Sequence, residues 1–155
     1  MATSVEAELV RAKRIVYLLL KFRSRSRKEI RDRLRRKKIS TATIDKAIEH
    51  FERLGYINDK NFAVAWVTTK IAKPLGPRRI FFELKQKGVD EEVIQQSWRG
   101  IEKEYCEYDA ALKVASVKMN TMKRLDRNTA KRRIYGLLNR RGFSRDVIQE
   151  VMEQL

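Results

Sequence analysis

The chain has 155 residues, of which 43% are hydrophobic and 36% charged, so it is long enough for a folded core and too apolar for a disordered chain. Lys and Arg outnumber Asp and Glu by 36 to 20, and the net charge of +16 favours a polyanionic partner, most commonly nucleic acid. The single cysteine, Cys106, excludes an internal disulfide and a zinc site built from cysteines, and it fits a reducing compartment.

The N-terminal sequence has neither the basic region nor the long apolar run of a signal peptide. The longest apolar block, residues 15–20, is far too short to span a bilayer. We therefore expect a cytoplasmic protein with no membrane partner. The charge alone leaves open an acidic protein groove, an acidic membrane surface, or simply a basic pI without a polyanionic partner.

The apolar spacing predicts a first helix over residues 5–22. Ser26 and Glu29 form a Ser-x-x-Glu capping box, which predicts that a second helix starts there. A third helix is expected from about residue 41 and stops near Gly55. These three helices make up a first unit.

A second unit begins with a helix that we expect Asp59 to cap. Residues 76–94 then predict a helix, a tight turn and another helix, with Pro77 in the first helical position and Gly88 in the left-handed conformation that ends the helix. A third unit begins near Tyr108, and Asn128 or Thr129 is expected to cap its second helix.

Equivalent positions recur in the three units. The repeated sets are Ile30, Ile80 and Ile134; Leu34, Leu84 and Leu138; Ile39, Val89 and Phe143; the caps Ser40, Asp90 and Ser144; and Ile44, Ile94 and Ile148. The offset is 50 residues and then 54, and we place the four extra residues in the connection before the third unit's second helix. The sequence thus predicts an all-α domain of three tandem three-helix repeat units, residues 1–54, 55–102 and 103–155. Each unit is expected to bury its apolar stripe against its own helices and its neighbours.

Lys38 departs from this repeat, because Gly88 and Gly142 stand at the equivalent turn. A non-glycine residue in the left-handed region carries a steric penalty of about 1 kcal/mol. We therefore expect the first unit to turn slightly differently, or its second helix to run longer.

The segments 55–63, 76–80 and 85–89 resemble the RecX family, in particular through Tyr-Ile-Asn-Asp followed by Phe-Ala and through Gly-Pro followed by Lys-Gly. Residues 140–148 resemble the C-terminal unit of that family, and residues 26–34 resemble its N-terminal unit. The resemblance covers nearly the whole chain and implies an elongated, curved molecule. It also implies binding to the RecA recombinase filament and modulation, usually inhibition, of its ATPase, strand-exchange and coprotease activities in recombination, DNA repair and the SOS response.

The residues offer little chemistry for catalysis. His50 is the only histidine and has no evident nucleophile beside it, so a structural or surface role is favoured over a catalytic one. There is no glycine-rich phosphate loop and no carboxylate or histidine cluster with metal-ligand spacing. We expect a protein that is not an enzyme and that uses no cofactor or metal.

The basic residues are concentrated at the two ends of the chain. The three units carry net charges of +9, +2 and +5, and residues 23–39 alone hold ten basic and two acidic residues. Within this segment Arg27, Arg31, Arg35 and Lys38 follow a spacing of 4, 4 and 3, which predicts a basic stripe along one helix. The alternative is an ordinary solvated helix face.

We expect contacts to the partner protein or to DNA phosphates at basic positions in all three units. These are Arg27, Arg31, Arg35, Arg36, Lys37, Lys38, Arg78, Arg79, Lys85, Arg132, Arg133, Arg140 and Arg141. Arg78 and Arg79 lie at a helix start, where the dipole disfavours cations, so an anionic contact explains them better. Basic residues at helix C-termini complement the dipole, which explains their recurrence equally well.

Some aromatic residues lie among these charges. Phe81 and Tyr135 occupy the position of Arg31, where core packing is favoured over a partner contact. Trp66 and Trp98 are expected in the core, with base stacking as the alternative. For the whole protein, a stand-alone basic DNA-binding protein is the alternative to a recombinase regulator, and a nuclease is a weaker third.

Overall fold

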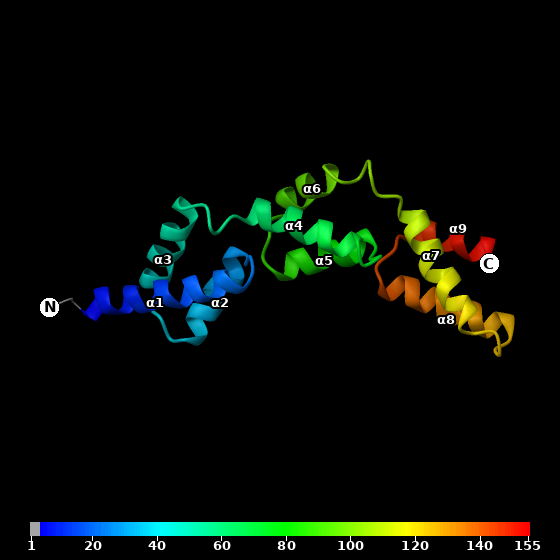
Figure 1. Ribbon diagram of the computed structural model, residues 1–155, viewed down its shortest axis with the longest axis horizontal. Helices are drawn as coiled ribbons and strands as arrows, with labels where there is room; N and C mark the ends of the chain where they lie inside the picture. Colours follow the sequence, from blue (N-terminus) through cyan, green and yellow to red (C-terminus); the bar gives the residue numbers. More distant parts are fainter. Residues whose placement is uncertain (1–3) are drawn as a thin grey trace.

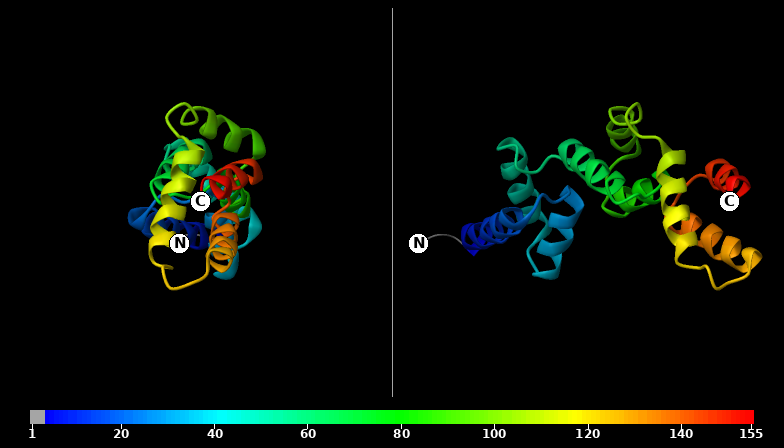
Figure 2. Two further views of the ribbon diagram at one scale, coloured as in Figure 1. Left: turned by 90° about the vertical axis from the view of Figure 1, so that its right-hand side faces the viewer. Right: turned by 45° about the vertical axis from the view of Figure 1, so that its right-hand side comes forward.

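The computed structural model describes residues 4–155, which form nine α-helices and no strand. The helices are α1 (Ser4–Phe22), α2 (Arg27–Arg36), α3 (Thr41–Arg53), α4 (Asp59–Ile71), α5 (Pro77–Gln86), α6 (Glu91–Arg99), α7 (Glu107–Asn120), α8 (Arg127–Arg140) and α9 (Arg145–Gln154). They form three units in a row, with α1 at one end and α9 at the other (Figure 1). The middle unit lies above the line that joins the outer two in Figure 1 and in the right-hand view of Figure 2, so the row is curved. The predicted all-α tandem architecture is confirmed.

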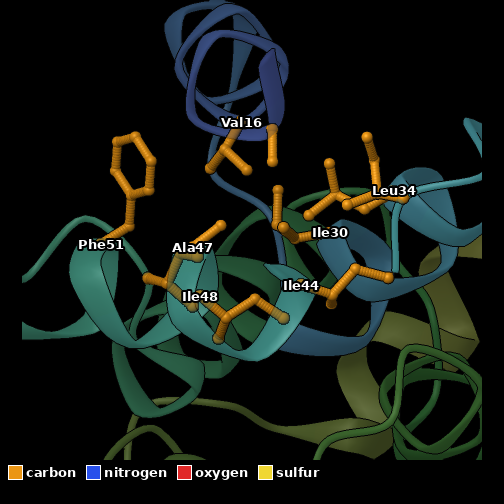
Figure 3. Close-up of a cluster of buried hydrophobic side chains, with 10 residues drawn as sticks. Val16, Ile30, Leu34, Ile44, Ala47, Ile48 and Phe51 are labelled. Atoms are coloured by element: carbon orange, nitrogen blue, oxygen red, sulfur yellow. The ribbon is translucent and has the colours of Figure 1, made fainter. Parts of the chain in front are cut away.

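Each unit has its own hydrophobic core. The first and third helices of a unit pack against each other, and the second helix packs across both. The first core is made by Val16 from α1, Ile30 and Leu34 from α2, and Ile44, Ala47, Ile48 and Phe51 from α3 (Figure 3). The equivalent isoleucines and leucines of α5 and α8 are fully buried in two further, separate clusters. The predicted core positions are confirmed. Each stripe packs mainly within its own unit, and Ile57 of the second unit and Tyr105 of the third also pack in the core of the preceding unit.

The helix starts confirm some of the expected caps and correct others. Ser26 caps α2 in a complete capping box with Glu29, as predicted. Asp59 does not cap α4, because Asn58 is the cap and its side chain accepts a hydrogen bond from the Asn61 N–H. The Asp59 carboxylate instead accepts the backbone N–H of Arg27 at 2.8 Å, so it links the first two units.

Helix α8 is one turn longer than its equivalents. Asp126 caps it by accepting the Thr129 N–H at 2.9 Å, so neither Asn128 nor Thr129 is the cap. The helix has 14 residues, compared with 10 in both α2 and α5. The four extra residues of the third unit therefore extend its second helix and do not lie in the connection, because Asp126 caps the chain one turn earlier than expected.

The first two units are joined by polar contacts. The Ser26 hydroxyl at the start of α2 donates to the Lys87 carbonyl oxygen at the end of α5, at 2.7 Å. The Lys28 ammonium donates to the Gln86 carbonyl oxygen at 3.1 Å, and the Lys87 ammonium pairs with Glu29 at 2.8 Å. The start of one unit's second helix thus rests on the turn that ends the next unit's second helix.

The second and third units meet in the same way. The Gly76 N–H donates to the Arg141 carbonyl oxygen at 2.9 Å, and the Arg78 N–H donates to the Gly142 carbonyl oxygen at 3.1 Å. In the repeat register Gly76 is equivalent to Ser26, and Arg141 is equivalent to Lys87. The two joints are therefore equivalent, with a serine hydroxyl as the donor in one and a backbone N–H in the other.

These joints explain the lysine at the first turn. Lys38 has a φ of 58°, close to the 73° of Gly88 and 81° of Gly142, so the expectation of a different turn or a longer α2 is wrong. A Cβ on Gly142 would lie 2.3 Å from the Arg79 nitrogen. At the first turn only the Arg11 side chain of α1 reaches the equivalent Lys37 carbonyl within residues 4–155, and the Lys38 side chain is exposed. Glycine is needed where another unit docks on the turn, and lysine is tolerated at the first turn, where no other unit docks within residues 4–155.

Candidate nucleic-acid and partner interface

Two groups of predicted basic residues lie free on the surface. Arg35, Lys37 and Lys38 at the C-terminal end of α2 and its turn are exposed, and their side chains have no hydrogen-bond or ion-pair partner within residues 4–155. The same is true, over the described chain, of the exposed side chains of Arg132, Arg133 and Arg140 on α8. These two ends of the molecule present the strongest uncompensated positive charge among the predicted residues.

The predicted stripe on α2 is divided by internal ion pairs. Arg31 pairs with Asp45 of α3 at 2.6 Å, and Arg27 pairs with Glu52 at 3.3 Å. Arg31 keeps only 23% of its side-chain surface exposed. Only Arg35 and Lys38 of the four stripe residues therefore lie free for an external anion.

Other predicted residues also have neighbours within the chain. Arg36 donates from Nε to the Asp32 carbonyl oxygen at 3.3 Å, which leaves its two terminal nitrogens free. Arg79 pairs with Glu83 at 2.9 Å, and Lys85 pairs with Glu91 at 2.5 Å. Such pairs at an exposed surface contribute little to stability, so they leave these residues accessible to an anionic partner.

Arg78 and Arg141 lie in the second joint. Arg78 Nη1 donates to the Phe143 carbonyl oxygen at 3.1 Å, and Arg141 Nη1 donates to the Pro74 carbonyl oxygen at 3.3 Å. These contacts explain why a cation stands at the start of α5 despite the helix dipole. They give both arginines a role within the chain, beside the predicted role in partner binding.

The first joint borders a groove of about 550 Å³ between α2, α4 and α5. On its wall Trp66 has the ammonium groups of Lys70 and Lys87 over its ring, at 4.5 and 4.4 Å from the centroid. Trp66 is half-buried and also stacks on Phe62, so core packing and the joint account for it without a bound base. Trp98 is buried in the second core, as predicted.

Glu29 is the most strongly perturbed carboxyl group of the joint. Burial by itself would raise its pKa, but hydrogen bonds from Arg23, Lys87 and the Ser26 N–H outweigh burial and lower the pKa to about 2. The carboxylate therefore stays ionised and holds the basic side chains of two units together.

The two aromatic residues at the Arg31 position differ. Phe81 packs edge-on against Trp98, with ring centroids 5.4 Å apart, which confirms the packing interpretation. Tyr135 is 50% exposed, so packing does not explain it, and it lies on α8 with the free arginines of that helix.

Sequence reasoning missed Arg25 and Arg33. Both line a pocket beside α2 together with Arg36, and neither has a hydrogen-bond or ion-pair partner within residues 4–155. Part of the signal was present, because residues 29, 32, 33 and 36 of α2 follow helical spacing on a face other than the predicted stripe. It was overlooked because Arg25 precedes the capping residue of the helix.

The described chain holds no group of three or more His, Cys, Asp or Glu side chains placed to bind a metal ion. His50 packs edge-on against Phe51 with ring centroids 5.2 Å apart, which is a structural environment. No helix within residues 4–155 is long and apolar enough to cross a membrane.

Three family models match the chain in order. They describe the first, second and third three-helix domains of RecX, and they match residues 12–51, 58–97 and 105–152. Together they cover most of the chain.

Curated relatives and solved structures agree with this match. The chain is 31% identical over 150 residues to regulatory protein RecX of Amycolatopsis mediterranei, covering 96% of this chain and 85% of the relative. It is 36% identical over 138 residues to that of Chlorobium phaeobacteroides, covering 88% of each. The crystal structure of RecX from Lactobacillus salivarius superposes with a TM-score of 0.80 at 25% identity, over 96% of this chain and 97% of that one. The chain belongs to the RecX family.

Proposed function

We propose that this protein is a regulator that binds the filament of the RecA recombinase and inhibits its ATPase, strand-exchange and coprotease activities. The observation that carries this proposal is the match of all three units, in order, to the domains of regulatory proteins named RecX. A regulator of this kind acts by occupying a surface and not by catalysing a reaction, and it is expected in the cytoplasm, where the recombinase and DNA are.

The arrangement of charge supports a partner that is long and anionic. Among the predicted contacts, the exposed and unpaired basic residues lie at α2 in the first unit and α8 in the third, on either side of the less basic middle unit. A curved row of three units can follow a groove, with both basic ends against acidic protein surface or DNA phosphates. Arg35, Lys37, Lys38, Arg132, Arg133 and Arg140 are the proposed contacts that lie free.

The direct test is the single-strand-dependent ATPase of the recombinase, measured with increasing amounts of this protein. Inhibition that saturates at a fixed ratio of protein to filament supports the proposal. An ATPase rate that is unchanged at saturating protein, with no binding to the filament in sedimentation, refutes it.

The second candidate function is a stand-alone basic DNA-binding protein, which the net charge of +16 favours. Fluorescence anisotropy with bare and recombinase-coated single strands separates the two functions. A clear preference for the coated strand supports the regulator. Equal affinity for both strands, falling steeply with salt, supports the stand-alone binder.

A further inference from the structure

A pocket of about 360 Å³ lies beside α2, between the end of α1 and the segment that precedes Ser26. Its lining includes three arginines, Arg25, Arg33 and Arg36, and the carboxylates Glu29 and Asp32. Its volume is at the lower end of the roughly 300–1,000 Å³ typical of small-ligand sites. The pocket faces away from the paired Arg27 and Arg31, so it is separate from the predicted stripe.

The guanidinium of Arg25 is unusual in its surroundings. Its Nε is fully buried and has no hydrogen-bond partner within residues 4–155. Burial lowers the pKa of Arg25 from its ordinary value, and repulsion from Arg23 and Arg33 adds to this effect while attraction by Glu29 opposes it. A buried donor without an acceptor is costly, so the Arg25 guanidinium gains a partner if it turns towards an acceptor in the pocket.

The two carboxylates of the pocket compensate its arginines only in part, because Glu29 attracts Arg25 but both carboxylates also pair with other basic side chains. Glu29 is held by Arg23 and Lys87 at 2.9 and 2.8 Å, and Asp32 lies 3.8 Å from the Lys28 ammonium. Arg33 has no ion-pair partner in the described chain, and Arg36 contacts only a backbone oxygen there. The pocket therefore has a net positive charge and several guanidinium N–H groups free to donate.

We propose that this pocket binds a phosphate group between the guanidinium groups of Arg25, Arg33 and Arg36. A phosphate offers oxygen acceptors in the geometry that arginine forks match, and its charge relieves the repulsion among three neighbouring cations. The phosphate is either a phosphodiester of a nucleic-acid strand or a free phosphate ion. Phosphate binding at this site does not require a recombinase, so it can be tested separately from the regulatory function.

The first experiment titrates the 15N-labelled full chain with inorganic phosphate at constant ionic strength and follows the Arg25 Nε–Hε resonance by NMR. We expect a saturable shift, and we expect Arg33→Gln to weaken it about tenfold through loss of a charged hydrogen-bond donor. Arg36→Gln tests the other wall of the pocket. Arg53→Gln is the matched control, because Arg53 is an exposed arginine of α3 in the same unit and does not line the pocket.

The second experiment identifies the source of the phosphate with an oligothymidylate strand and its uncharged methylphosphonate analogue. If a phosphodiester occupies the pocket, Arg33→Gln should weaken strand binding about fivefold at 0.1 M salt, and Arg53→Gln should weaken it less. The uncharged analogue should leave the Arg25 Nε–Hε resonance unshifted. A shift with inorganic phosphate alone assigns the pocket to a free ion. No saturable shift with either ligand, or equal losses in the Arg33 and Arg53 variants, overturns the proposal.

Discussion

The Ser26 hydroxyl donates a hydrogen bond to the Lys87 carbonyl oxygen, 61 residues further along the chain, at 2.7 Å. The same hydroxyl accepts the Glu29 N–H at 3.2 Å and so caps α2. One buried side chain thus starts a helix in the first unit and fixes the second unit against it. Since each unit has its own core, such joints determine how the units are placed relative to one another.

Replacing Ser26 should cost more than replacing another serine cap. Ser26→Ala removes a cap worth about 1 kcal/mol and leaves the Lys87 carbonyl oxygen without its hydroxyl donor, at about 1–3 kcal/mol more. Ser144→Ala is the control, because Ser144 stands at the start of α9 without a side-chain capping bond. Denaturant unfolding measures both, and equal losses would mean that the Ser26–Lys87 contact contributes nothing.

Gly142→Ala should open the second joint. Its φ of 81° carries a penalty of about 1 kcal/mol for any side chain, and the added Cβ would lie 2.3 Å from the Arg79 nitrogen. Gly55→Ala has a similar φ of 77° but no atom within 4 Å, so it isolates the conformational penalty. Small-angle scattering should show a changed shape for the Gly142 variant alone. An unchanged profile together with equal stability losses would contradict the steric role of Gly142.

Acid should weaken the first joint through Glu29. Its pKa falls from an ordinary 4.5 to about 2 on folding, so its stabilisation is complete above pH 4.5 and is lost as the pH falls towards 2. At about 1.4 kcal/mol per pKa unit, this contribution is of the order of 3 kcal/mol. The stability difference between the wild type and Glu29→Gln should therefore shrink between pH 4.5 and 2. A difference that is constant over this range would show that Glu29 is not held as described.

Leu84→Ala should destabilise the middle unit by about 2–5 kcal/mol, because Leu84 is fully buried. Phe82→Ala on the same helix is the control. Because Phe82 is 54% exposed, this variant should lose well under 1 kcal/mol of unfolding free energy. Because the three cores are separate, amide hydrogen exchange should accelerate in α4–α6 more than in the outer units. An unchanged melting temperature for Leu84→Ala would show that this face of α5 does not lie in the core.

Two charge reversals on α2 should separate binding from folding. Arg35→Glu changes an exposed, unpaired residue, so it should weaken binding to the filament or to DNA at unchanged stability. Arg31→Glu places a second carboxylate beside Asp45, so it should lower the melting temperature. Filament sedimentation and circular dichroism measure the two effects. If the Arg35→Glu variant binds as tightly as the wild type at physiological salt, the end of α2 is a solvated surface that makes no partner contact.

The predicted interface was only partly readable from charge and spacing. Spacing placed Arg27, Arg31, Arg35 and Lys38 along α2, but it could not reveal that Asp45 and Glu52 of α3 would pair with two of them. Those carboxylates lie 14 and 25 residues from their partners, and only the packing of α3 on α2 brings them together. For the same reason, Arg25 and Arg33 gained their importance only from the pocket that they share.

The sequence by itself determined the helices, the repeat and the buried positions, because apolar period, caps and turn glycines act within a few residues of each other. The equivalent residues Ile30, Ile80 and Ile134 are all fully buried, as their register predicted. Only the tertiary structure decided how the units join. The joint between Gly76 and Arg141 is made by backbone groups, and nearly every residue carries these groups. A pattern of side chains in the sequence therefore cannot predict it. The tertiary structure also explained why glycine stands at two turns and lysine at the first, because the close approach of a preceding unit, and not the turn itself, excludes a side chain.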